Sequence, residues 1–138
     1  MILELDCGNT RVKWRVRNAE NIVMRGAFLT SEGINQSTSE ELARAAITRV
    51  LIGSVLSDEY AKKLASWSIT YLGVNPEFAV SEPHHNGIVN GYQQPEKLGV
   101  DRWLAILAAT AKASSAWIIV DCGSAITVDL VTSQGEHL

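Results

Sequence analysis

The chain has 138 residues, of which 46% are hydrophobic and 20% charged, a composition typical of one soluble globular domain. Its net charge of −3 argues against a general nucleic-acid binder, which needs a basic face. The two cysteines, Cys7 and Cys122, have neither metal-ligand spacing nor a disulfide framework, which indicates a reducing, cytoplasmic setting. Because no signal peptide and no membrane-length apolar run are visible, we expect no membrane partner.

The first 29 residues predict a meander of three antiparallel strands, at residues 2–5, 11–17 and 21–29. The middle strand alternates strictly, with Val12, Trp14 and Val16 on one face and four cations on the other. This pattern is typical of a strand that is buried on one side only.

Residues 30–75 alternate between helical and strand patterns. Thr38 and Glu41 match a capping box and predict the start of a helix. The predicted elements are a helix from 38 to about 48, a buried strand at 50–55, a helix from Ser57 or Asp58 to about Trp67, and a strand at 69–72.

Residues 76–95 contain all three prolines of the chain and two Asn-Gly pairs, and therefore predict a long loop. A helix is predicted over about residues 97–113, with a buried stripe made of Val100, Trp103, Leu104, Leu107, Ala108 and Ala111. Two strands follow, at residues 117–120 and 126–131.

An Asp-Cys-Gly tripeptide lies between two strand patterns near both ends of the chain, at residues 6–8 and 121–123. Glycine permits close backbone approach, and successive N–H groups in a tight turn form an anion-binding nest. The carboxylate can hold Mg²⁺ or its waters. One such motif alone is more often an ordinary hairpin turn, whereas two favour a pair of loops that grip a polyphosphate and its metal.

The segment Gly99-Val100-Asp101-Arg102 lies at the start of the predicted long helix and has two interpretations. Asp101 is either a first-turn acid favoured by the helix dipole, with Arg102 solvated or paired, or a general base beside an arginine that binds an anionic substrate. The sequence alone leaves both open.

Other candidates have plainer interpretations. His84 and His85 invite a metal site, but adjacent histidines rarely ligate one ion and no third ligand stands nearby. Tyr92 is either a loop anchor or a substrate contact. The four tryptophans fall on apolar positions and are expected in the core: Trp14, Trp67, Trp103 and Trp117.

Three motifs occur in an order and spacing that resembles the type III pantothenate kinases, of the Bvg accessory factor family: Asp6-Cys7-Gly8-Asn9-Thr10, Gly99-Val100-Asp101-Arg102 and Asp121-Cys122-Gly123-Ser124-Ala125-Ile126-Thr127. The resemblance extends over the whole chain. It implies an α/β fold of the actin and sugar-kinase superfamily, with ribonuclease-H-like domains that each have a mixed sheet flanked by helices. It also implies ATP-dependent phosphorylation of pantothenate, the first step towards coenzyme A.

The resemblance assigns roles to individual residues. It implies a catalytic base at Asp101 and a monovalent cation, K⁺ or NH₄⁺, at Asp121. Asp6 would lie near the Mg²⁺ that accompanies ATP, in contact with it directly or through water. The implied ATP-binding residues are Asp6, Cys7, Gly8, Asn9, Thr10, Arg11, Val12, Lys13 and Ser124, where the family usually has threonine at the last position. The implied pantothenate contacts are Tyr92, Gly99, Val100, Asp101 and Arg102.

Members of this family run to about twice this length. We therefore expect residues 1–115 to form a first ribonuclease-H-like domain and residues 116–138 to be the truncated start of a second. The family is homodimeric, and we expect the 138 residues alone to be inactive.

Two alternatives remain. The first is another small-molecule kinase or a polyphosphate phosphatase of the same superfamily, against which the Gly99–Arg102 motif argues. The second is a non-enzymatic regulatory protein that binds DNA, for which only the basic strand Arg11–Arg17 offers a surface.

Overall fold

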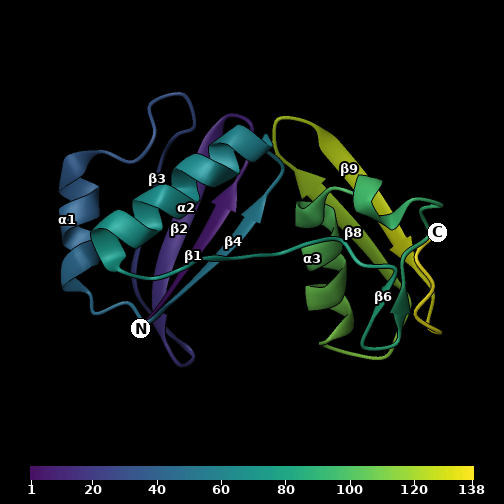
Figure 1. Cartoon of the computed structure of the whole chain (residues 1–138). Helices are drawn as coiled ribbons and strands as arrows, with labels where there is room; N and C mark the ends of the chain where they lie inside the picture. The colour runs from purple at the N-terminus through teal and green to yellow at the C-terminus, as the bar shows by residue number, and fades with distance from the viewer. The chain divides into compact units, whose positions relative to one another are not determined.

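The computed structural model describes all 138 residues, which form two compact units, residues 1–79 and 80–138 (Figure 1). The elements of the first unit are β1 (Ile2–Cys7), β2 (Arg11–Asn18), β3 (Asn21–Leu29), α1 (Gln36–Arg44), β4 (Arg49–Ser54), α2 (Asp58–Leu72) and β5 (Glu77–Phe78). Those of the second are β6 (His84–His85), β7 (Ile88–Val89), a 3₁₀ turn η1 (Pro95–Lys97), α3 (Val100–Thr110), β8 (Trp117–Cys122) and β9 (Ile126–Val131).

The first unit is built on a five-stranded mixed sheet in the order β3-β2-β1-β4-β5. The strands β1, β2 and β3 form an antiparallel meander, while β4 and β5 run parallel to β1 and to each other. The predicted meander is therefore confirmed. The prediction of a mixed sheet flanked by helices is confirmed as well.

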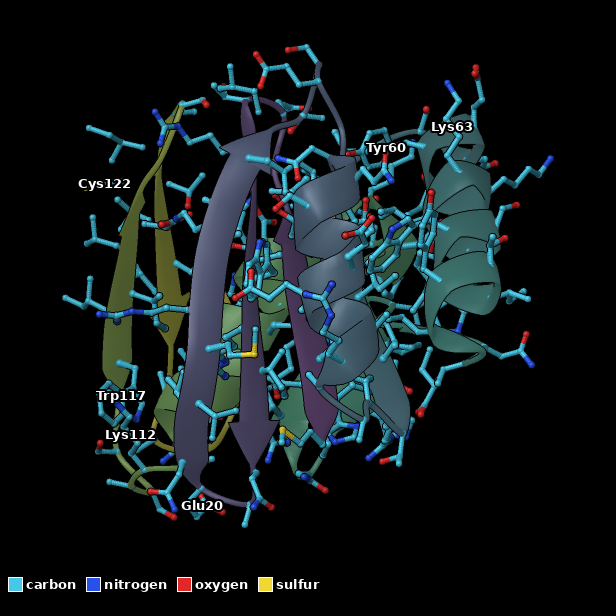
Figure 2. All side chains as sticks on the ribbon, turned by 90° about the vertical axis from the view of Figure 1, so that its left-hand side faces the viewer. Glu20, Tyr60, Lys63, Lys112, Trp117 and Cys122 are labelled. Atoms are coloured by element: carbon cyan, nitrogen blue, oxygen red, sulfur yellow. The ribbon has the colours of Figure 1, made fainter.

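One face of this sheet carries the core of the first unit. Alternation along β1 and β2 directs every second side chain to the same side, as expected from the period of two in a strand. Helices α1 and α2 lie over this face, and their side chains fill the space between helices and sheet (Figure 2). The buried strand residues are Leu3, Leu5, Cys7, Val12, Trp14, Val16, Val50 and Ile52, and they pack against Leu42 and Leu64.

Helix α1 starts earlier than the capping-box pattern predicts. Its N-cap is Asn35, whose side-chain oxygen accepts a hydrogen bond of 2.8 Å from the backbone N–H of Thr38. Asparagine is as good an N-cap as threonine, so Thr38 lies inside the helix, which then ends at Arg44 instead of near residue 48.

Helix α2 begins as predicted, with Ser57 as its N-cap, but the predicted strand at 69–72 is wrong. The helix continues to Leu72 and stops at Gly73, which adopts a left-handed conformation with φ of 66°. Trp67 and Tyr71 stack at helical spacing, with ring centroids 6.4 Å apart. This packing overrides the strand preference of Ile69, Thr70 and Tyr71.

The second unit packs α3 against the antiparallel hairpin β8–β9. The predicted stripe is only partly correct, because Ile106 is fully buried whereas Leu104 is 41% exposed. The core of this unit contains Ile88, Leu98, Trp103, Ile106 and Val131, with Leu107, Trp117 and Ile119 packed against it. All four tryptophans thus contribute to a core, as predicted: two are buried and two partly buried.

The outer face of the β8–β9 hairpin is apolar and exposed. Its side chains are Ile118, Val120, Ile126, Val128 and Leu130, and all are at least 42% exposed. Cys122 lies at the turn end of this hairpin and Trp117 at the opposite end (Figure 2). No helix is long and apolar enough to cross a membrane.

Along the chain, the boundary between the two compact units lies between Ala79 and Val80. The predicted division at residue 115 concerned ribonuclease-H-like domains. That assignment stays a prediction, because compactness alone does not define such a domain.

Candidate functional site

Each of the repeated Asp-Cys-Gly tripeptides lies at the end of the first strand of an antiparallel hairpin. In each hairpin the aspartate and cysteine end the first strand, and the glycine N–H donates a 3.0 Å hydrogen bond across the turn, to Arg11 in one case and Ala125 in the other. The turns comprise residues 8–10 and 123–125. The sequence repeat therefore marks two similar hairpins, whose registers differ by one residue: Cys7 pairs with Val12 and Cys122 with Ile126. The two turns lie in different compact units, and their joint grip on one nucleotide stays a prediction.

The first turn presents a mixed set of side chains. Asp6 and Lys13 are exposed cross-strand neighbours, and Asn9, Thr10 and Arg11 are exposed beside them. Thr30 braces the turn, since its hydroxyl donates to the carbonyl of Gly8 at 2.8 Å. The arrangement offers donors, two cations and one carboxylate on an open surface, which suits a polyphosphate with its metal.

Two residues of the predicted ATP-binding set point the other way. The side chains of Cys7 and Val12 face the core and are 1% and 0% exposed. Both backbones also belong to the sheet, where the two residues pair with each other and Val12 also pairs with Phe28. Any contact of these residues with a ligand would therefore involve the backbone alone.

The cysteine of the first turn is chemically inert. Burial, reinforced by the charge of Asp6, raises the pKa of the Cys7 thiol to about 12, so it stays protonated at neutral pH. Cys122 at the matching position is exposed. At pH 8 we expect a disulfide reagent such as DTNB to titrate Cys122 at once and Cys7 only after denaturation. Rapid reaction of Cys7 in the native protein would contradict the buried position.

Asp6 is compatible with a magnesium ion that ATP brings with it. No three His, Cys, Asp or Glu side chains converge on a metal position. Mg²⁺ in phosphoryl-transfer sites commonly uses one or two protein carboxylates, with phosphate oxygens and waters as its other ligands. A single exposed carboxylate beside a phosphate turn fits that pattern.

The second turn offers oxygen ligands for a different kind of ion. Asp121 pairs with Thr127 across β8 and β9, and the buried hydroxyl oxygen of Thr127 has no hydrogen-bond partner. An unsatisfied buried oxygen next to a carboxylate suits a hard cation. The donor set is therefore consistent with the monovalent ion predicted at Asp121.

The Gly99–Arg102 motif forms the start of α3, with Gly99 as its N-cap. The Val100 side chain is buried, at 8% exposed. Asp101 is exposed, and its Oδ1 accepts the backbone N–H of Arg102 at 2.8 Å. This contact fixes the carboxylate at the helix start, where the dipole also favours it.

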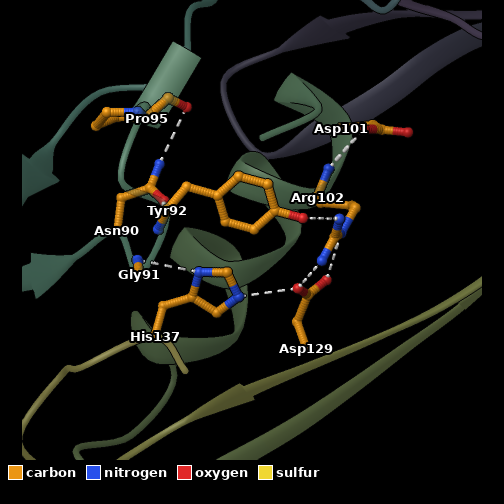
Figure 3. A network of polar contacts seen from close by, with 8 residues as sticks. All are labelled: Asn90, Gly91, Tyr92, Pro95, Asp101, Arg102, Asp129 and His137. Carbon is orange, nitrogen blue, oxygen red and sulfur yellow. Dashed lines mark hydrogen bonds and ion pairs between the residues drawn. The ribbon is translucent and has the colours of Figure 1, made fainter. Parts of the chain in front are cut away.

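Arg102 is the centre of a polar cluster that the sequence did not reveal (Figure 3). Its Nε donates to Asp129 Oδ2 at 3.0 Å and its Nη2 to Asp129 Oδ1 at 2.5 Å. Its Nη1 donates to the hydroxyl of Tyr92 at 2.9 Å. His137 Nε2 lies 2.9 Å from Asp129 Oδ1. We refer to Tyr92, Arg102, Asp129 and His137 as the Arg102 cluster.

The loop from residue 80 to 98 holds Tyr92 in place through Asn90. Asn90 is 7% exposed, and its Oδ1 accepts the Tyr92 N–H at 3.0 Å. Its Nδ2 donates to the carbonyls of Glu82 and Pro95. The Asn-Gly pair thus marks more than a turn: the amide ties three parts of the loop together.

Asp129 and His137 were missed because each looked ordinary in the sequence. Asp129 lies within the predicted strand 126–131, and His137 lies beyond that strand, directly before Leu138. One signal was available: an acid within an otherwise apolar strand is rarely buried unless it is paired. Asp129 is 2% exposed, and the Arg102 hydrogen bonds lower its pKa.

The two histidines of the loop and the basic strand have local partners. His85 Nδ1 lies 2.9 Å from Glu82 Oε2, and His84 pairs with Val89 in β6–β7. On β2, Arg15 and Arg17 both contact Glu4. Half of the cations that could form a DNA-binding surface are therefore neutralised within the sheet, which disfavours the regulatory alternative.

Comparison with known proteins identifies relatives along the whole chain. The family model for type III pantothenate kinase matches residues 2–138. Proteins named type III pantothenate kinase from Cellvibrio japonicus and Pseudomonas putida KT2440 are 40% and 37% identical, over 100% of this chain and 56% of their own length. The chain thus spans about half the length of these curated relatives.

A solved structure supports the fold. A protein described as a 2-dehydro-3-deoxygalactonokinase, from Sinorhizobium meliloti, superposes on 97% of this chain and 50% of its own with a TM-score of 0.58. At 7% sequence identity this likeness concerns the fold alone. It agrees with the predicted α/β fold.

Proposed function

Because the chain belongs to the type III pantothenate kinase family, we propose that the protein transfers the γ-phosphoryl group of ATP to the terminal hydroxyl of pantothenate. The observation that carries this proposal is the start of α3. There an exposed carboxylate, Asp101, stands next to an arginine that is fixed in one orientation by three hydrogen bonds. A base beside a fixed guanidinium suits a substrate that has both a reacting hydroxyl and a carboxylate.

In this proposal Asp101 accepts the hydroxyl proton while the hydroxyl oxygen attacks the γ-phosphorus of ATP, and ADP leaves. The pantothenate contacts are Tyr92, Gly99, Val100 and Arg102. Bound Mg²⁺ supplies charge neutralisation on the phosphates.

The first turn, with Asp6 and Lys13, binds the ATP phosphates, and Ser124 of the second turn reaches the nucleotide. Asp121 binds the monovalent cation, K⁺ or NH₄⁺. The hydroxyl oxygen of Thr127 supports this assignment, because it is buried without a hydrogen-bond partner and Thr127 pairs with Asp121 across β8 and β9.

The hairpin β8–β9 is proposed to begin a second ribonuclease-H-like domain. Its exposed apolar face supports this, since such a face in a complete sheet is covered. We further propose a cytoplasmic homodimer in which the partner chain completes the substrate pocket.

The test is an assay of ATP-dependent phosphorylation with a panel of hydroxy acids and sugars. We expect the protein expressed from its complete gene to phosphorylate pantothenate with Mg²⁺ and to require K⁺ or NH₄⁺. The 138-residue chain should give no turnover, because it spans about half the length of the curated relatives and the cleft of this proposal includes a second domain. A folded protein that prefers a sugar, or that hydrolyses polyphosphate instead, would refute the proposal.

A further inference from the structure

We propose that Asp129 and His137 are positioning residues for Arg102, and that they aim the outer edge of its guanidinium at the carboxylate of the substrate. This rests on the proposed function and names which end of the substrate the cluster recognises. Several hydrogen bonds of the Arg102 guanidinium are already made inside the second unit.

A guanidinium has five N–H groups. Three of those of Arg102 are engaged, by both oxygens of Asp129 and by the hydroxyl of Tyr92. One N–H group remains on each terminal nitrogen, and the two terminal nitrogens of a guanidinium can bind a carboxylate through two parallel hydrogen bonds. Because the Arg102 side chain is 22% exposed, part of it is accessible to a ligand.

Asp129 orients the guanidinium of Arg102 because its own carboxylate is buried and held by several hydrogen bonds. Its side chain is 2% exposed, and it receives hydrogen bonds on both oxygens from Arg102 and a third from His137. A buried carboxylate with this many partners is costly to displace. The fixed carboxylate therefore sets the plane of the guanidinium.

His137 holds Asp129 from behind. The segment that carries it is anchored by the backbone: His137 N–H donates to Val89 O at 3.0 Å, and Leu138 N–H donates to Leu130 O at 2.9 Å. The two ring nitrogens of His137 have different partners: Nδ1 accepts the N–H of Gly91, and Nε2 faces the carboxylate of Asp129. This assigns the proton to Nε2, which then donates to Asp129.

Tyr92 completes the cluster from the loop side. Its ring stacks on His137 with an interplanar angle of 8° and lies 5.6 Å from the guanidinium carbon of Arg102. The aromatic face stabilises the cation while the hydroxyl accepts from Nη1. The loop and β9 thus hold the Arg102 side chain directly, through Tyr92 and Asp129, and the C-terminal segment supports both of these residues through His137 (Figure 3).

The kinetic test compares pantothenate with pantothenyl alcohol, in which a CH₂OH group replaces the carboxylate. In the protein expressed from its complete gene, Asp129→Asn places an NH₂ group against the Arg102 donors and should disorient the guanidinium. We expect KM for pantothenate to rise about tenfold, with a smaller change in kcat and no change in KM for ATP. The preference for pantothenate over pantothenyl alcohol should shrink by the same factor.

Two further variants keep the test decisive. Tyr92→Phe removes one hydrogen-bond acceptor of Arg102. Because Tyr92 is 38% exposed, this variant should fold normally. Its preference for pantothenate over pantothenyl alcohol should shrink by a smaller factor than that of Asp129→Asn. Ile106→Val removes a methyl group from the same core and should leave the preference intact. An unchanged preference in both Asp129→Asn and Tyr92→Phe would overturn the proposal. A rise in KM for ATP instead of pantothenate would also overturn it, because the Arg102 guanidinium would then bind the γ-phosphate.

A second measurement does not depend on activity. In ¹⁵N NMR spectra of the 138-residue chain, we expect a slowly exchanging Nε–H signal from Arg102 and the Nε2–H tautomer of His137. Asp129→Asn should abolish the slowly exchanging Nε–H signal of Arg102. If these signals appear but no pantothenate is phosphorylated, the positioning stands and the proposed function fails. If pantothenate is the substrate but Arg102 exchanges freely, the positioning is refuted.

Discussion

Replacing Asp101 by asparagine is expected to lower kcat for pantothenate phosphorylation by at least ~100-fold, with ATP affinity largely retained. Asparagine has the same shape and keeps the oxygen that accepts the Arg102 N–H at 2.8 Å. It cannot accept the proton of the substrate hydroxyl. The measurement is steady-state kinetics of the protein expressed from its complete gene, together with calorimetric titration of ATP.

The same variant separates the two interpretations of Asp101. As a first-turn acid it stabilises α3 by about 0.3–1 kcal/mol, and the loss of that amount would leave the rate unchanged. Glu96→Gln is the matched control, because this exposed carboxylate in η1 lies close in the sequence and has no proposed role. Normal turnover by Asp101→Asn would remove the base assignment.

Gly91→Ala is expected to destabilise the second unit by about 2–4 kcal/mol. A Cβ atom at this position would lie 2.1 Å from the carbonyl oxygen of His137 and 2.9 Å from its carbonyl carbon. Neither backbone can yield easily, since His137 is hydrogen-bonded to Val89 and Gly91 N–H faces the His137 ring. Displacing this segment would also draw the imidazole away from Asp129.

Urea denaturation and hydrogen exchange of residues 80–138 would measure this loss. Gly123→Ala provides the control: its Cβ would meet nothing nearer than Ala125 O at 3.9 Å, so the free energy of unfolding should change by less than about 0.5 kcal/mol. Equal stability of the two variants would mean that the close approach at Gly91 is not present in solution.

The elements that were predicted well are those fixed by local patterning. The strands β1 to β3, β8 and β9 follow from alternation and from the Asp-Cys-Gly segments that mark the ends of β1 and β8. The start of α2 follows from Ser57 in the same way. Each of these signals acts between residues that are neighbours along the chain.

The errors arose where packing decided between two acceptable local conformations. Residues 69–72 have strand-forming side chains, yet they continue α2 because Trp67 and Tyr71 stack and Gly73 supplies the left-handed cap. In β9 the apolar residues Ile126, Val128 and Leu130 are exposed, while Asp129 is buried. Alternation identifies two faces but not which of them meets a helix.

The sequence by itself determined the family, the two hairpin turns at the Asp-Cys-Gly segments and the position of Asp101 and Arg102 at a helix start, because these depend on motifs and on short-range spacing. Only the tertiary structure brought Asp129 to Arg102 and His137 to Asp129. Those contacts join residues 27 and 8 positions apart, through a strand pairing and a C-terminal segment held by backbone hydrogen bonds. A buried ion pair of this kind depends on which face of β9 is covered, and that is decided by the packing of α3.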